Sequence, residues 1–262
     1  MQHLIPTIQI WQRQALRAHQ ARVRSFSLTP HTLWARLSAF MLCACLLALG
    51  SCSAVSAPTP VIHTQTSPAT LTYVAIGASD TFGIGASDPY AENWPTDLSN
   101  LLGTQTHLIN LGVPSMTIHV ALTAELPIAL DSHPKLVTIW LAVNDLATNV
   151  PVDIYSHDLD TMLSRLQTAS PGVRIEVGNV PDLLSVPFFQ NYDQTALSQS
   201  MASYNTAIAS VVQRHHVILV DLSGQGYNLQ EFPEYVSRDG LHPSSIGYLR
   251  LAQLFYDALH KG

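Results

Sequence analysis

The chain has 262 residues, 47% of them hydrophobic, a length that suits one sizeable domain or two small ones. All 18 Asp and Glu residues lie at or after Asp80, and from Ser53 onward only seven Lys or Arg balance them, which leaves that part near −11. An acidic body argues against nucleic acid as a partner, because phosphate contacts need clustered Lys and Arg.

Residues 1–52 have the pattern of a targeting segment. A basic lead with five arginines ends at Arg36, and an apolar run of about fourteen residues follows, shorter than the roughly 20 that span a bilayer. The run ends at Leu49-Gly50-Ser51-Cys52, which resembles the lipobox of bacterial lipoproteins, where the cysteine is lipidated. We expect export and a lipid anchor at Cys52; an ordinary signal peptide or an uncleaved anchor are the alternatives.

The remaining chain divides into a tether and a folded body. Cys43, Cys45 and Cys52 are the only cysteines, so the exported part has neither a disulfide nor a Cys-based metal site. Residues 53–70 are rich in Ser, Thr and Pro and predict an extended tether. Residues 71–262 are then the folded domain.

Within this domain, short apolar runs alternate with helical periodicity. The expected strands are 71–78, 107–111, 136–143, 173–177 and 217–222. Three apolar stripes predict helices, around Leu159–Leu166, Leu197–Val211 and Leu251–Leu259. The run 136–143 is almost wholly apolar, as a strand covered on both faces must be, whereas 173–177 alternates with charges and suggests a strand nearer an edge. We predict an α/β fold, a three-layer α/β/α sandwich with a five-stranded parallel sheet in the flavodoxin-like order 2-1-3-4-5.

The predicted order places three polar positions together. Ligands bind beyond the carboxyl ends of strands at the switch point between strands 1 and 3, and Ser79 directly follows strand 1. Gly112 follows strand 2, and Asn144 follows strand 3. The N–H of Ser79, the N–H of Gly112 and the Asn144 amide can converge on one oxygen as an oxyanion hole.

A serine nucleophile also needs a base, and His242 is the best-placed histidine. His3, His19 and His31 precede the export signal, His63 lies in the tether, and His215 and His216 are adjacent and point apart. Asp239 precedes His242 by three residues across a glycine turn, so its carboxylate can hold Nδ1–H and leave Nε2 for the serine proton. Taken singly, each of these residues also has a structural reading as a turn, a cap or a local hydrogen-bond network.

The four motifs together resemble the SGNH, or GDSL-type, hydrolase superfamily over 71–259. Ser79 lies in "IGASDTFGIGA", Gly112 in "INLGVPS", Asn144 in "WLAVNDL", and Asp239 and His242 in "DGLHPSSIGYLRLAQLF". Ala78 replaces the Asp of the usual Gly-Asp-Ser block, and Ala142 replaces the Gly of the usual Gly-x-Asn-Asp block; neither change removes a catalytic group.

The resemblance implies hydrolysis of carboxylic esters through an acyl-serine intermediate. It implies Ser79 as nucleophile, His242 as general base and then acid, Asp239 as its orienting carboxylate, and an oxyanion hole of Ser79, Gly112 and Asn144. The implied partner is a small-molecule acyl ester, with no metal and no organic cofactor. Short loops favour small acyl groups, and the apolar segment 180–189 either lines an acyl pocket or packs on the last helix.

Other readings fit the sequence less well. An α/β-hydrolase lipase needs G-x-S-x-G, and Thr81 occupies the second Gly position. A phosphate-binding loop in "GASDTFGIG" lacks the following Gly-Lys-Ser/Thr. A catalytically silent surface lipoprotein that binds acylated glycans or lipids is the alternative from another functional class. The natural ester and the oligomeric state are open at this point.

Overall fold

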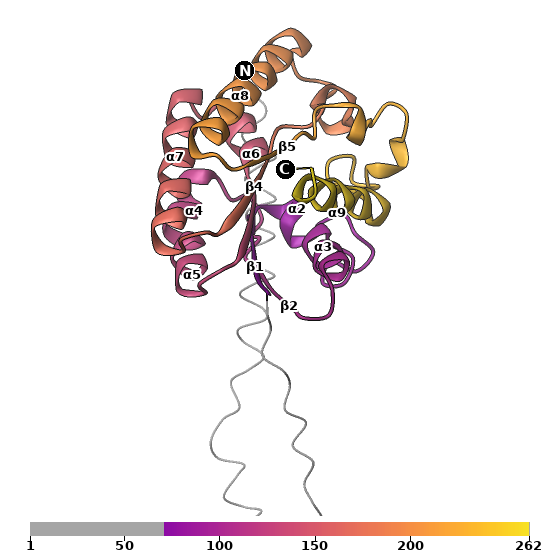
Figure 1. The fold of residues 1–262 in the computed structure, drawn as a ribbon. Helices are drawn as coiled ribbons and strands as arrows, with labels where there is room; N and C mark the ends of the chain where they lie inside the picture. Colours follow the sequence, from indigo (N-terminus) through magenta and orange to yellow (C-terminus); the bar gives the residue numbers. More distant parts are fainter. Residues whose placement is uncertain (1–70, 262) are drawn as a thin grey trace, which may run out of the picture. The chain divides into compact units, whose positions relative to one another are not determined.

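A five-stranded parallel sheet forms the centre of the domain (Figure 1). The computed structural model describes residues 71–261, so the targeting segment, Cys52 and the tether lie outside the described residues. The strands are β1 (Leu71–Gly77), β2 (Thr106–Asn110), β3 (Leu136–Trp140), β4 (Arg174–Gly178) and β5 (Ile218–Val220). Their order, β2-β1-β3-β4-β5, is the predicted one.

Helices cover both faces of the sheet and make the predicted three layers (Figure 1). One face carries α4 (Ile118–Ala124), α5 (Leu126–Asp131), α7 (Val152–Ala169) and α8 (Gln194–His215). The other carries α3 (Trp94–Leu102) and α9 (Ser245–Leu259). The short helices α2 (Ser79–Phe82) and α6 (Ala142–Ala147) follow β1 and β3 directly. Four 3₁₀ turns lie in the later connections: Leu183–Ser185, Pro187–Phe189, Gln225–Tyr227 and Pro233–Tyr235.

The three apolar stripes lie in α7, α8 and α9, as predicted. One face of α7 is fully buried, because residues three and four apart share one face of a helix. It carries Leu159, Met162, Leu163 and Leu166. On the opposite layer α3 packs against α9, where Trp94 stacks on Phe255 with ring centroids 4.3 Å apart. This contact joins the beginning of α3 to the second half of α9.

Strand β3 is buried along its whole length but is shorter than predicted. All five residues Leu136–Trp140 are buried, as expected for a central parallel strand. The expected strand 136–143 is wrong at its end, because the backbone leaves the sheet at Leu141 and α6 begins at Ala142. Ala142 and Val143 are apolar because they belong to the buried turn after the strand and to the cavity wall.

Strand β4 lies next to the edge strand β5. Only one of its two charged residues is exposed to solvent. Arg174 is exposed at the strand start, whereas Glu176 is fully buried. Among the described residues, neither carboxylate oxygen of Glu176 has a hydrogen-bond partner. Burial raises the pKa of Glu176 to about 8, so this residue behaves as a neutral core group at neutral pH.

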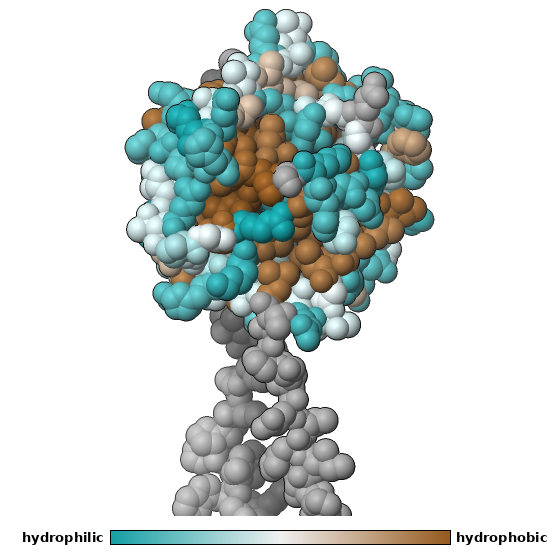
Figure 2. All heavy atoms as spheres, in the orientation of Figure 1, coloured by the Kyte–Doolittle hydropathy of each residue, from teal (hydrophilic) through white to brown (hydrophobic). Residues whose placement is uncertain are grey.

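The sheet edge formed by β5 lies on the face seen in Figure 2. Apolar surface gathers over β5 there. A hollow beside this strand is lined by five apolar residues and two charged ones: Ile218, Leu219, Val220, Leu254 and Ala258, with Asp221 and Lys261. A strand of only three residues is a poor template for pairing with another chain. Among the helices of residues 71–261, none combines the length and the hydropathy that a membrane span needs.

Candidate active site

Ser79 lies in a tight strand-to-helix turn at the carboxyl end of β1. It begins the single-turn helix α2, and both Gly83 and Ile84 donate their backbone N–H to its carbonyl. The turn closes this tightly because Gly77 has no side chain: a Cβ there would lie 1.9 Å from Thr81 Oγ1. Gly83 takes the left-handed conformation, φ 106°, that ends the helix.

Asp239 and His242 form a locally closed loop just before α9. Asp239 Oδ1 accepts the backbone N–H groups of Leu241 and His242, at 2.8 and 3.0 Å. Its other oxygen, Oδ2, lies 2.7 Å from His242 Nδ1. Gly240 takes φ 74°, which a glycine tolerates, and lets the loop turn back within three residues.

The fold brings this loop to Ser79 although 163 residues separate the two. His242 Nε2 lies 3.0 Å from Ser79 Oγ. Two contacts fix the approach: Tyr248 of α9 donates its hydroxyl to Ile84 O at 2.6 Å, and a Cβ on Gly85 would meet Pro243 O at 2.5 Å. The hydroxyl, the imidazole and the carboxylate therefore form one continuous hydrogen-bonded row.

Two carboxyl groups determine the electrostatics around the imidazole. Desolvation alone would raise the pKa of Asp239, but the hydrogen bonds from His242 Nδ1 and the loop N–H groups outweigh it and hold that pKa below its usual value. Asp80 lines the same cavity, and its Oδ1 accepts the Thr81 N–H at 2.9 Å. Desolvation raises the pKa of Asp80 to about 6, with His242 opposing the shift.

Asn144 reaches the cavity from α6, directly after β3. Its Nδ2 donates to Met116 O at 2.9 Å, which orients the amide and leaves its second N–H free of any bond within the described chain. The next residue, Asp145, is buried and accepts the Ile118 N–H at the start of α4. This bond ties α6 to α4 and holds the Asn144 turn in place.

Gly112 follows β2 as predicted, but it is not among the residues that line the cavity. Its N–H donates to Asn110 Oδ1 at 2.9 Å. A Cβ at this position would lie 2.4 Å from Phe82 N and 2.7 Å from Thr81 C, so the glycine lets the chain after β2 pack directly on α2. Its visible role in the structure is this close backbone approach.

The cavity beside Ser79 has a volume of about 70 Å³ and walls that are mostly apolar. Ser79, Asp80, Asn144 and His242 supply the polar side chains. The apolar lining comes from Trp140, Leu141, Val143, Pro181, Leu183, Val186, Tyr227, Leu229, Val236 and Leu241. Of the segment 180–189, Pro181, Leu183 and Val186 therefore line the cavity. Phe188 and Phe189 pack instead with Tyr192 in an aromatic cluster.

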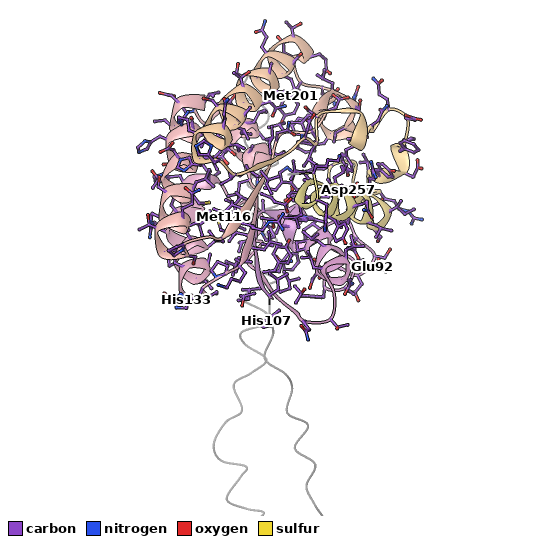
Figure 3. All side chains as sticks on the ribbon, viewed as in Figure 1. Glu92, His107, Met116, His133, Met201 and Asp257 are labelled. Atoms are coloured by element: carbon purple, nitrogen blue, oxygen red, sulfur yellow. The ribbon has the colours of Figure 1, made fainter. Side chains whose placement is uncertain are left out.

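Part of this wall was missed by reasoning from the sequence. Tyr227, Leu229 and Val236 come from the long connection between β5 and α9, which carries no periodic pattern that would place it. His107 and His133 were not among the histidines that the sequence excluded. His107 and His133 lie at the opposite end of the sheet from His242, near the starts of β2 and β3 (Figure 3). In the described part of the chain, no cluster of His, Cys, Asp or Glu has the makings of a metal site.

Comparisons with known proteins agree on the fold. A comparison with curated protein sequences found no match. Among solved structures, a family 3 carbohydrate esterase of Clostridium thermocellum is 22% identical, with a TM-score of 0.58, and the match covers 73% of this chain and 96% of the esterase. The esterase EstA of Pseudoalteromonas sp. is 18% identical, with a TM-score of 0.59 and coverage of 73% and 97%. The acetyl xylan esterase AlAXEase is 18% identical, also with a TM-score of 0.59, and coverage is 72% and 99%.

The family model gives the assignment itself. The model of the GDSL-like lipase/acylhydrolase family matches residues 75–250, which extends from β1 into α9 and includes every residue of the cavity wall. At such identities the solved structures establish the fold, and the family match establishes the chemistry in general terms. The chain therefore belongs to the GDSL-like lipase/acylhydrolase family and is a hydrolase that acts on ester bonds.

Proposed function

We propose that this protein hydrolyses short-chain carboxylic esters through an acyl-serine intermediate formed on Ser79. The observation that carries the proposal is the row from Ser79 Oγ to His242 Nε2, 3.0 Å, and from His242 Nδ1 to Asp239 Oδ2, 2.7 Å. Nucleophile, base and orienting carboxylate lie within hydrogen-bond reach of one another, as nucleophilic catalysis requires.

The chemistry proceeds in two halves. Asp239 holds the proton on Nδ1, so Nε2 accepts the Ser79 proton while Oγ bonds to the acyl carbon of the substrate. The protonated Nε2 then donates to the leaving alkoxide as the ester bond breaks. In the second half, water gives a proton to Nε2 and attacks the acyl carbon, and the imidazolium returns that proton to Ser79 Oγ as the carboxylic acid leaves.

The oxyanion formed in each half needs donors. Ser79 and Asn144 both line the cavity, so we assign this role to the Ser79 N–H and to the second N–H of Asn144 Nδ2. Gly112 contributes a third donor only if its N–H exchanges the bond to Asn110 Oδ1 for one to the oxyanion. One lost donor of this kind costs about 10²–10³ in kcat, so Asn144 carries a substantial share of the rate in this proposal.

The size of the cavity supports a short acyl group. Its volume of about 70 Å³ is roughly half that of the engineered 150 Å³ cavity that accommodates benzene. Leu183, Val186 and Leu229 contribute apolar side chains to its wall. We therefore expect acetyl to butyryl esters as substrates and long acyl chains to be excluded.

Replacement of Ser79 by Ala tests the proposal. Hydrolysis of p-nitrophenyl acetate and butyrate should fall by roughly 10⁴-fold or more, because the nucleophile is absent. A fluorophosphonate probe should label the wild type and not the variant, and circular dichroism should show the same fold for both. Unchanged turnover in Ser79→Ala refutes the assignment, and failure to label the wild type favours a silent protein that binds acylated glycans or lipids.

We also propose that the protein is exported and anchored to a membrane through a lipid on Cys52. The support is the sequence alone: a basic lead, an apolar run and the Leu49–Cys52 motif, followed by the Ser/Thr/Pro-rich residues 53–70. The full-length protein should partition with membranes, and Cys52→Ala should move it to the soluble or secreted fraction. Membrane retention of that variant contradicts the proposal.

A further inference from the structure

A buried carboxyl group lies behind the strand end that carries Ser79. Glu125 joins α4 to α5, and the residue is only 2% exposed. Its Oε2 accepts a hydrogen bond from the N–H of Gly77, the last residue of β1, at 3.2 Å. The carboxyl group of Glu125 therefore contacts the backbone two residues before Ser79, from the opposite side to His242.

This bond supplies an acceptor at the end of β1, beyond the last residue of β2. Strand β2 ends at Asn110, and the residues after it still serve the carbonyl groups of β1: Leu111 N donates to Ala75 O and Val113 N donates to Gly77 O. The Gly77 N–H is served by the Glu125 side chain instead. A buried N–H without an acceptor is costly, so Glu125 stabilises the geometry from which the Ser79 turn starts.

The surroundings of the Glu125 carboxyl group favour its neutral, protonated form. Its second oxygen, Oε1, has no partner among residues 71–261. The buried hydroxyl of Thr81, which packs on Gly77, has none there either. Burial raises the pKa of Glu125 to about 8; the Gly77 hydrogen bond lowers it, and the charge of Asp80 raises it further. At neutral pH Glu125 is therefore a neutral acid in a buried site.

The charged groups around this region are few. Asp80 approaches from α2, on the side of the cavity, with His242 beyond it. The groups that contact α4 from the other helices, or that lie on its own surface, are Asp145 of α6, Asp158 and Arg165 of α7, and His119 of α4. Within the described chain none of these cations makes an ion pair with Glu125, so its negative form lacks compensation.

We propose that Glu125 is a positioning residue that supports the Ser79 turn as a neutral acid, and that its ionisation sets the alkaline limit of catalysis. The inference rests on the function proposed for Ser79. An ionised Glu125 places a negative charge in the interior beside the end of β1, where the oxyanion develops in the transition state. Charges interact strongly in a low-dielectric interior, so we expect the negative charge to disfavour the oxyanion and to lower kcat.

Two variants distinguish the hydrogen bond that Glu125 accepts from Gly77 from the ionisation of the Glu125 carboxyl group. Glu125→Gln keeps an oxygen for the Gly77 N–H but cannot ionise, so kcat at neutral pH should stay within a few-fold of wild type and the alkaline loss of activity should disappear. Glu125→Ala removes the acceptor, and kcat should fall roughly 10- to 100-fold with little change in KM, as for a small misplacement of a reacting group. The substrate is p-nitrophenyl butyrate, corrected for spontaneous hydrolysis.

Glu176→Gln is the matched control. Glu176 is the other fully buried glutamate, with a pKa also raised to about 8, but it lies on β4 away from Gly77. This variant should retain the alkaline limb of the wild-type kcat profile, near pH 8. If both Gln variants lose the limb equally, general destabilisation explains it and the inference is wrong.

The proposed function and this inference fail in different ways. A wild-type protein that does not react with a fluorophosphonate probe overturns the role of Ser79. A wild type that is labelled and active, but that shows no fall in kcat around pH 8, overturns only the role of Glu125. The role of Glu125 is also overturned if kcat of Glu125→Gln falls at alkaline pH as in the wild type. This test does not require Glu125→Ala to fold.

Discussion

Two histidine–carboxylate pairs in this protein have nearly the same local geometry and very different surroundings. His242 Nδ1 lies 2.7 Å from Asp239, and His119 Nδ1 lies 3.0 Å from Asp158. The His242 side chain is 18% exposed and its other nitrogen meets Ser79 Oγ, whereas the His119 side chain is 76% exposed. His119 Nε2 makes no hydrogen bond to any other residue within 71–261.

The difference shows that pairing with a carboxylate does not by itself make a histidine a base for catalysis. The imidazole of His242 is enclosed by a cavity wall, faces a hydroxyl and has a carboxylate behind it. The imidazole of His119 caps Asp158 on the outside of α4 and α7, where it links two helices. The first pair faces the Ser79 hydroxyl inside a cavity, whereas the second lies at the exposed surface.

The sharpest way to break this comparison is to remove each imidazole. His242→Ala should lower kcat/KM for p-nitrophenyl butyrate by about 10⁴-fold or more, because the serine loses its base. His119→Ala should leave kcat/KM within about twofold and cost less than about 1 kcal/mol of unfolding free energy, as for an exposed pair. Comparable losses of activity in the two variants would contradict the distinction drawn between the pairs.

The surroundings of the two pairs should also differ in how their contribution to stability depends on pH, which is a smaller effect. Asp145, next to the His119–Asp158 pair, has its pKa raised to about 7, chiefly by burial. A raised carboxyl pKa contributes stability that is complete below the unfolded value of 3.8 and is lost as pH rises through 7. Asp239, with its lowered pKa, contributes stability that is present above 3.8 and lost in acid.

Asp145→Asn tests the sign of this difference. The amide oxygen still accepts the Ile118 N–H and carries no charge, so the variant should lose less stability than wild type between pH 4 and 8. At pH 8 the free energy of unfolding of the variant should exceed that of wild type by of the order of 1.4 kcal/mol per unit of pKa shift. Urea denaturation at several pH values measures it. An equal slope in the two proteins would show that Asp145 does not titrate in this range.

The sequence also determined more of the fold than of the cavity. Layer number and the three long helices follow from local runs: "LVTIW" is apolar because both faces are covered, and the α7 stripe recurs at helical spacing. The strand order was predicted from the flavodoxin-like fold and not from any local run. The end of β3 was wrong by three residues, because apolar composition does not distinguish a buried strand from the buried first turn of a helix at Ala142.

The chemical groups of the site were visible as motifs, since Ser79, Asn144, Asp239 and His242 each follow a strand or precede α9 in a recognisable order. Their distances, the occupied N–H of Gly112 and the support from Glu125 depend on segments that only packing brings together. Residue types and periodicity act locally along the chain, so they determine elements and candidate chemistry. Contacts across 48 or 163 residues arise from side-chain packing between layers, and the tertiary structure alone decided them.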